Sequence, residues 1–212
     1  MQQTQLHRKG KQMLDNLSEQ EQLNLKNARV LYYDFFNGLL VFEMLEERVR
    51  IAKEQLGILL SAPLNQEAEG SMLLLKQELE DNGIQNIKEE FSRLFALPFG
   101  GKQVGMHLSH YYENCIGGQS LLKIRALMKQ SDVRVNTESF KETEEHLGFL
   151  CGFMRYLIEK ENVELAKEVF LFSQKAFLGW VEEIKIRSDA KFYLALALIV
   201  ESFMKFEMEF YS

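Results

Sequence analysis

The stretch Phe140–Ile158, with the sequence FKETEEHLGFLCGFMRYLI, decides the fold that we expect for this chain. Its first part carries the acids Glu142, Glu144 and Glu145, which are followed directly by His146. From the histidine onward, apolar side chains recur at spacings of three and four residues, the period of one buried helix face. The stretch therefore predicts an amphipathic helix with a cluster of acids at its N-terminal end. The expected buried face consists of His146, Phe149, Leu150, Phe153, Met154 and Leu157.

The start of this helix is predicted from the capping preferences of polar residues. We expect a helix over about 141–159 with Thr143 as its N-cap. Glu144 and Glu145 would then lie in the first turn, where the helix dipole favours negative charge. The acidic cluster fits four interpretations: a general acid/base site, a metal site, a cation-binding mouth or a solvated helix start. A cation-binding mouth beside an apolar helix would suit a ligand that is basic first and apolar next.

Helical periodicity also dominates on both sides of this stretch, and no segment alternates with period two for long. We therefore expect an all-α fold, a bundle of roughly nine to ten helices without a sheet. The chain is expected to form one domain over 1–212, with an N-terminal half at about 21–130, a polar hinge at about 131–139 and a C-terminal half at about 140–212. A frayed lead-in is expected over 1–20, followed by a helical pattern over about 23–49 that Asn37-Gly38 can break. The next helices are expected over 48–60, over 66–79 with an end at Asn82-Gly83, and over 84–95 with an end at the Leu97–Gly101 loop. Two helices split at Gly117-Gly118 are expected between 103 and 130, and the last two cover 162–184 and 189–210.

Composition narrows the class of function. A net charge of -6 and a pI near 5.4 disfavour general nucleic-acid binding, which requires a basic surface, but they permit a basic peptide as partner. The longest apolar run, Phe192–Val200, is much shorter than the roughly 20 residues of a transmembrane helix, so no stable membrane insertion is expected. Cys115 and Cys151 form neither a metal-ligand spacing nor a disulfide framework, which favours the reduced cytoplasm.

The sequence contains no pattern that predicts catalysis. It has no Walker loop, no G-x-G-x-x-G and no G-x-S-x-G. His107, His110 and Glu113 share one helical face and could hold a metal, but a fourth ligand is missing, and surface polar residues explain them better. We therefore expect a protein that is not an enzyme, with no catalytic residues, no metal and no cofactor.

An aromatic segment, FSRLF at Phe91–Phe95, ends a predicted helix. Phe91, Leu94 and Phe95 fall on one face by helical spacing. Packing in the core is the default for such a stripe, and the wall of an open apolar groove is the alternative. The sequence leaves both interpretations open.

Several segments together resemble the TorD/DmsD-type family of redox-enzyme maturation chaperones. The FSRLF segment resembles the family's aromatic-x-x-Leu-Phe signature, and Glu142–His146, ETEEH, resembles its later Glu-Pro-x-Asp-His. The resemblance runs from about residue 91 to the C-terminus. Further matches are the aromatic-acid pair Tyr112-Glu113, Trp180 near the end of the penultimate helix and Phe192–Leu196 at the opening of the last one.

Three positions depart from the family pattern. Thr143 replaces the proline, and Glu145 replaces the aspartate with a carboxylate one methylene longer. Ala176 stands where many members have histidine. These departures imply a divergent member of the family.

The resemblance implies a cytoplasmic chaperone that binds the twin-arginine signal peptide, and the apo-form, of a molybdopterin-containing oxidoreductase and assists cofactor insertion before export. Two adjacent arginines need bidentate carboxylate partners, and the apolar part of a signal peptide needs an aromatic groove. Members can exchange C-terminal helices, so a monomer or a domain-swapped homodimer is expected, with 131–139 as hinge. The expected peptide-binding residues are Glu142, Glu144, Glu145, His146, Phe91, Leu94, Phe95, Tyr111, Tyr112 and Glu113.

Other classes of function stay open at this point. A helical transcription regulator would need a basic recognition helix, and the basic stretch Arg48–Lys53 is short. A di-metal bundle would need Glu-x-x-His pairs on two helices, which the sequence lacks. A helical scaffold could bind another protein through the same groove without any catalytic role.

Overall fold

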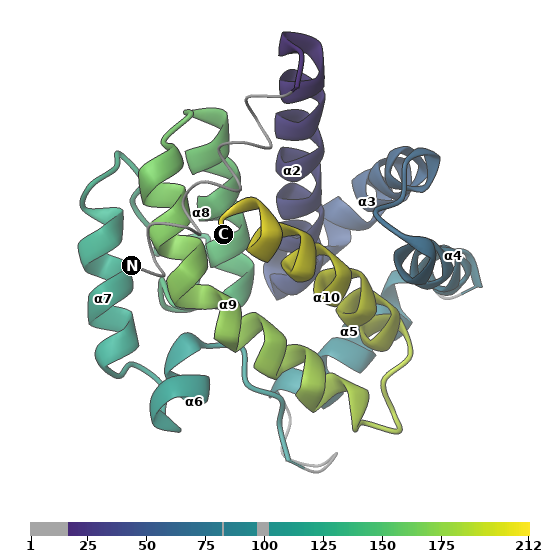
Figure 1. Cartoon of the computed structure of the whole chain (residues 1–212). Helices are drawn as coiled ribbons and strands as arrows, with labels where there is room; N and C mark the ends of the chain where they lie inside the picture. The colour runs from purple at the N-terminus through teal and green to yellow at the C-terminus, as the bar shows by residue number, and fades with distance from the viewer. Residues whose placement is uncertain (1–16, 82, 97–101) are drawn as a thin grey trace.

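The computed structural model describes residues 17–81, 83–96 and 102–212, and over these residues the fold is all-α (Figure 1). No strand occurs among them, and an isolated bridge between His107 and His146 is the β-type pairing found there. The expected all-α fold class is confirmed. The elements are α2 (Glu19–Leu40), the 3-10 turn η1 (Phe42–Met44), α3 (Leu45–Ser61), α4 (Gln66–Asp81), α5 (Ile84–Phe91), the π-helical turns η2 (Ser92–Ala96), α6 (Leu108–Glu113), α7 (Gln119–Met128), α8 (Leu147–Glu159), α9 (Val163–Lys185) and α10 (Phe192–Phe210).

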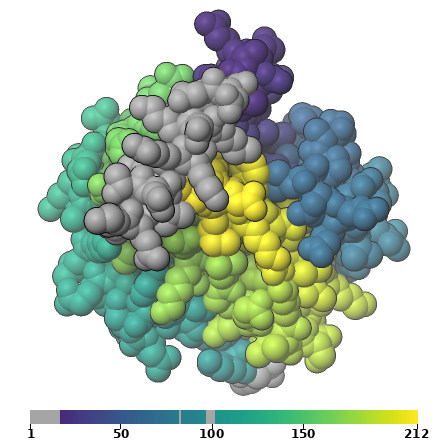
Figure 2. Space-filling model, in the orientation of Figure 1, coloured from purple at the N-terminus to yellow at the C-terminus, as the bar shows by residue number. Residues whose placement is uncertain are grey.

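The core lies where α2 packs along α8 and where α10 crosses α4 and α9. On the face shown in Figure 2, the yellow helix α10 lies between the blue pair α3 and α4 and the green α9. Aromatic rings fill much of this core. The Phe203 ring stacks on Tyr32 at 4.7 Å and meets Tyr33 edge-on at 5.0 Å between centroids.

A buried ion pair joins the first and last helices of the core. The Arg29 guanidinium donates to the Glu207 carboxylate at 2.6 Å and 3.0 Å, and Tyr33 donates to the same carboxylate at 2.9 Å. Because both charges are buried, they persist only as a fully hydrogen-bonded group. The network therefore fixes how α2 lies against α10.

The break in the first long helical segment is displaced from its expected position. Asn37-Gly38 stays helical, and α2 continues to Leu40. Val41 follows as the C-cap and adopts an extended backbone with φ −112° and ψ 114°. Long-range contacts hold the two residues in the helix. Asn37 donates to the carbonyl of Gly148 in α8 at 2.8 Å, and the missing side chain of Gly38 leaves room for Arg48. The expected break at Asn37-Gly38 is therefore wrong, and Phe42 begins the 3-10 turn η1 instead.

The start of α8 also differs from the expected one. The helix begins at Leu147, and its N-cap is His146, whose Nδ1 accepts the N–H of Gly148 at 3.2 Å. Backbone pairing with the preceding segment prevents an earlier start, because Leu147 donates to the carbonyl of Met106 at 2.8 Å. The expectations that Thr143 is the N-cap and that Glu144 and Glu145 lie in the first turn are therefore wrong.

The other predicted bounds agree within a few residues. The split at Gly117-Gly118 is confirmed, since α6 ends before it and α7 follows it. The segment 131–139 contains no helix, and its role as a hinge stays a prediction. Of the expected lead-in over 1–20, residues 1–16 lie outside the described residues, and α2 already begins at Glu19 with Ser18 as its N-cap. Asn82 and the loop Leu97–Gly101 also lie outside the described residues, and Gly83 is the N-cap of α5. Within the described part, no helix combines the length and the apolar character that crossing a bilayer requires.

Candidate functional site

A cleft of about 660 Å³ opens where η1, η2 and the segments 102–107 and 140–146 meet. We call it the aromatic cleft, because phenylalanine side chains make up much of its wall. Its aromatic members are Phe42, Phe91, Phe95 and Phe140, its acids are Glu43 and Glu142, and its histidines are His107, His110 and His146. A volume of this size suits a peptide segment or a small molecule.

The aromatic wall is built by η1 and by the junction of α5 with η2. The Phe91 ring lies 5.3 Å from Phe42 and 4.8 Å from Phe95, measured between centroids. Phe42 is 41 % exposed, whereas Leu94, which lies between Phe91 of α5 and Phe95 of η2, is 0 % exposed and packs in the core with the buried part of Phe91. The two interpretations of the FSRLF stripe therefore each apply to part of it.

Behind this wall lies the chain's single tryptophan, Trp180. Its buried ring stacks on Phe95 at 6.3 Å between centroids, and Tyr193 meets Phe95 edge-on at 5.0 Å. The position of the Phe95 ring is thus set by α9 and α10 as well as by its own turn. The indole of Trp180 is a natural optical probe of the aromatic wall.

Glu142 is the member of the acidic cluster that faces the cleft. Its side chain is 47 % exposed, and its Oε2 lies 3.1 Å from Nε2 of His107. The hydrogen bond from His107 lowers the pKa of Glu142 below its ordinary value. The carboxylate is therefore ionised at neutral pH and half open to a cation that enters the cleft.

Glu145 has a different environment, because its side chain is 0 % exposed. Its Oε2 accepts the N–H of Ser109 at 2.8 Å and also the hydroxyl of that residue, and its Oε1 accepts the N–H of Gly117 at 2.7 Å. The backbone carbonyl of Glu145 takes the N–H of Leu108 at 3.1 Å. Glu145 therefore joins the segment before α8 to the start of α6 and to the loop before α7.

Glu144 pairs with Arg125 of α7 and does not line the cleft. The Arg125 Nε lies 3.0 Å from both carboxylate oxygens, and a terminal nitrogen lies 2.9 Å from Oε2. This is the bidentate geometry that we expected for a peptide arginine, but the guanidinium belongs to the chain itself. The three glutamates thus take three different environments.

His146 is buried at the inner end of the cleft. Burial of the ring, and next the electrostatic repulsion from His107, lower the pKa of His146 from 6.5 to about 3. The ring therefore stays neutral over the physiological range. The His107 ring meets it edge-on at 5.3 Å between centroids. A neutral ring that accepts the Gly148 N–H serves as the N-cap of α8.

A second polar group supports the 102–107 wall from α9. Glu183 accepts the N–H of Gly105 at 3.0 Å and lies 3.1 Å from Nε2 of His110. Tyr111 donates to the carbonyl of Gly105 at 2.7 Å. A side chain at position 105 would overlap the His110 ring, so glycine is required for this close approach. Tyr111 consequently braces the wall from outside the cleft.

Tyr112 and Glu113 point to other partners. The Tyr112 hydroxyl donates to the carbonyl of Phe172 in α9 at 2.5 Å, and the two rings stack at 5.3 Å between centroids. Glu113 accepts the hydroxyl of Ser120 at 2.6 Å, next to the start of α7. Of the ten expected site residues, the cleft thus brings together Phe91, Phe95, Glu142 and His146, and Leu94, Tyr111, Tyr112, Glu113, Glu144 and Glu145 lie elsewhere.

Phe42 and Glu43 line the cleft, although neither was predicted from the sequence as a site residue. They follow Val41, where the chain leaves α2 without a glycine or a proline, so no local signal marks the turn. His107 and His110 were considered as metal ligands. Within the described ranges, no group of three or more metal-binding side chains assembles.

The chain is similar to a known protein family and to a curated relative. The model of the family described as "Nitrate reductase delta subunit" matches residues 61–184, from the end of α3 to near the end of α9. A curated relative from Haemophilus influenzae, described as "Probable Tat proofreading chaperone DmsD", is 30% identical to the chain over 120 residues. The aligned residues make up 54% of this chain and 57% of that relative, so the chain spans little more than half of the relative's length.

Proposed function

The chain belongs to the nitrate reductase delta subunit family, and on this premise we propose that it is a maturation chaperone for a redox enzyme exported by the twin-arginine route. It binds the twin-arginine signal peptide and the apo-form of a molybdopterin-containing oxidoreductase in the cytoplasm. By holding this precursor, it delays export until the cofactor has been inserted. It catalyses no reaction and carries no cofactor of its own.

The observation that carries the proposal is the pairing of acids with phenylalanines in one cleft. Glu43 and Glu142 supply two carboxylates, and Phe42, Phe91 and Phe95 supply an apolar wall beside them. A twin-arginine signal peptide has the matching order of chemistry, two guanidinium groups followed by an apolar segment. Each guanidinium can donate two parallel hydrogen bonds to one carboxylate.

Binding at Glu142 involves an exchange of partners. The Glu142 carboxylate interacts with Nε2 of His107 at 3.1 Å. An arginine of the peptide takes the place of this imidazole and adds a second, parallel hydrogen bond. Glu43 is adjacent to Phe42 in η1, so the second arginine and the start of the apolar segment can bind neighbouring residues.

Isothermal titration calorimetry with a synthetic twin-arginine signal peptide tests the proposal. We expect the wild-type chain to bind the peptide at least about tenfold more tightly than a copy with both arginines changed to glutamine, because a charge-assisted hydrogen bond contributes roughly 1.5–3 kcal/mol. The double variant Glu43→Gln, Glu142→Gln should lose most of this preference.

Glu144→Gln is the matched control, because it removes a neighbouring carboxylate that is paired with Arg125 outside the cleft. It should bind the peptide as the wild type does. Equal affinity of the wild type for the arginine and glutamine peptides would refute the proposal. A loss with Glu144→Gln as large as that with the double variant would place the binding elsewhere.

A further inference from the structure

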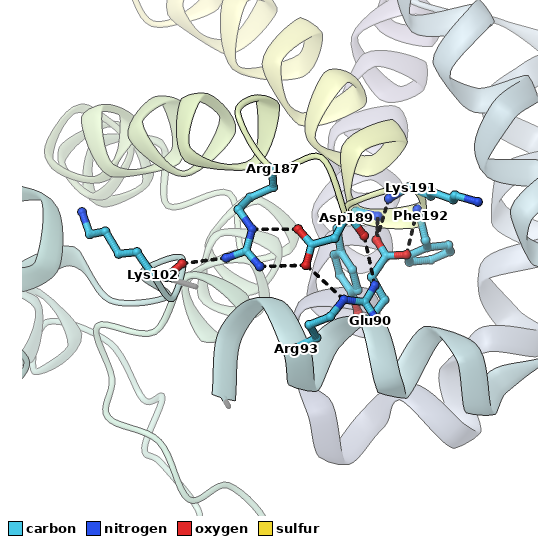
Figure 3. A network of polar contacts seen from close by, with 8 residues as sticks. Glu90, Arg93, Lys102, Arg187, Asp189, Lys191 and Phe192 are labelled. Carbon is cyan, nitrogen blue, oxygen red and sulfur yellow. Dashed lines mark hydrogen bonds and ion pairs between the residues drawn. The ribbon is translucent and has the colours of Figure 1, made fainter. Parts of the chain in front are cut away.

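Asp189, in the loop between α9 and α10, binds two arginines that come from different parts of the chain (Figure 3). Its Oδ2 accepts Nε of Arg93 at 3.0 Å, and its backbone carbonyl accepts a terminal nitrogen of the same arginine at 3.0 Å. Arg187 approaches from the other side and donates to Oδ1 and Oδ2, each at 2.8 Å. One carboxylate thus holds two guanidinium groups in fixed positions.

The two arginines contact two wall segments of the aromatic cleft, which are also joined directly, because the N–H of Val104 donates to the carbonyl of Leu94 at 2.9 Å. Arg93 belongs to η2, the turn that also carries Phe95 of the aromatic wall. Arg187 donates to the carbonyl of Lys102 at 2.6 Å, and Lys102 begins the 102–107 wall. Figure 3 shows this chain of contacts, from Lys102 through Arg187 and Asp189 to Arg93.

Glu90, one helical turn before Arg93, makes a different connection. Its buried carboxylate accepts the backbone N–H groups of Lys191, Phe192 and Tyr193 at 2.9, 3.3 and 2.9 Å. It thereby satisfies the free donors at the start of α10 and anchors the end of α5 in the core. Asp189 instead acts on the exposed side of the same junction, where its side chain is 29 % exposed.

We infer that Asp189 is a positioning residue of the aromatic cleft, which adds a side-chain link to the direct backbone hydrogen bond from Val104 to Leu94 and so holds the η2 wall and the 102–107 wall in fixed positions. This inference rests on the proposed function, since it concerns the affinity of that cleft for the signal peptide. A wall that is already held in its bound position loses less freedom when the peptide enters, and binding is tighter as a result. Without the contacts of Asp189, the peptide would have to order the cleft walls when it binds, and its affinity would be lower.

The expected effects separate positioning from general stability. Partly exposed ion pairs contribute little to the stability of the fold, so Asp189→Asn should lower the melting temperature by less than about 4 °C. We expect the same variant to weaken peptide binding about three- to tenfold. It should also increase the quenching of Trp180 fluorescence by acrylamide, because the Phe95 ring of the aromatic wall stacks on the buried indole.

Glu201→Gln is the matched control. Glu201 also joins α9 to α10 by pairing with two cations, Lys185 at 2.7 Å and Lys205 at 3.1 Å, and its side chain is 20 % exposed. It does not line the cleft. This variant should melt about as Asp189→Asn does but keep the wild-type peptide affinity and the wild-type quenching of Trp180.

The inference is overturned if Asp189→Asn retains the wild-type affinity, with or without a change in quenching. It is also overturned if Glu201→Gln weakens binding to the same degree. Failure of the proposed function would look different, because the wild-type chain itself would then not distinguish the arginine peptide from the glutamine peptide. In that case, the quenching of Trp180 tests the positioning role by itself. Stronger quenching in Asp189→Asn than in Glu201→Gln would support this role, and equal quenching in the two variants would contradict it.

Discussion

The carboxylate of Glu145 accepts the backbone N–H of Ser109 at 2.8 Å, and this contact fixes the segment before α8 against the start of α6. The same carboxylate also binds the N–H of Gly117 at 2.7 Å. Glu145, the most buried acid of the acidic cluster, therefore holds together the segments around the cleft. Glu142 is the acid of this cluster that faces into the cleft.

From this geometry we expect Glu145→Gln to destabilise the chain by about 2–3 kcal/mol, because an amide nitrogen would face donors that now bind a buried carboxylate. Urea denaturation measures the loss. Glu144→Gln, which breaks a more exposed pair with Arg125, should cost less than about 1 kcal/mol. Equal losses in the two variants would contradict the assignment of Glu145 to the architecture.

The sequence predicted much of the fold, because helical periodicity is a local property. The buried face of α8 was predicted from spacing, and five of its six expected members, Phe149 being the half-buried one, are buried. The resemblance to the TorD/DmsD-type family is confirmed by the family match. Both results rest on patterns that are contained within short segments of the chain.

The environments of the three glutamates could not be predicted in the same way. Glu145 differs from Glu144 only through partners far away in the sequence, Ser109 and Gly117 for the first and Arg125 for the second. Sequence spacing contains no information on such pairs. The position of Phe42 was missed for a related reason, because α2 continues through Asn37-Gly38 owing to contacts with Gly148 and Arg48.

Leu94 of η2 and Phe42 of η1 should respond differently to truncation. Leu94→Ala removes a fully buried side chain and should cost about 2–5 kcal/mol of stability. Phe42→Ala removes a half-exposed ring of the cleft wall, so it should cost little stability but weaken binding of the signal peptide. Thermal melts and peptide titrations of both variants check this, and a Phe42→Ala variant that binds normally would remove η1 from the site.

His146 makes the stability of the fold depend on pH. Its pKa is lowered from 6.5 to about 3 in the folded chain, so between these values the unfolded chain binds the additional proton. The free energy of unfolding therefore decreases as the pH falls, by at most about 1.4 kcal/mol per pH unit from this group, and its contribution is complete above pH 6.5.

His146→Asn isolates this effect, because asparagine can accept the Gly148 N–H as an N-cap but does not titrate. Urea denaturation at several pH values between neutral and about pH 4 should show the wild type losing stability faster than the variant. The free energy of unfolding of the wild type minus that of the variant should therefore decrease as the pH falls. Parallel curves would mean that another group controls the acid sensitivity.

The central claim, that the aromatic cleft captures the signal peptide, is tested most directly by site-specific photocrosslinking. A benzophenone amino acid is placed at Phe42, which lines the cleft, and separately at Leu122 of α7, which is 55 % exposed and lies outside it. We predict that a twin-arginine peptide crosslinks at position 42 and not at position 122, and that excess unlabelled peptide abolishes the product. Crosslinking at position 122 with none at position 42 would contradict the account.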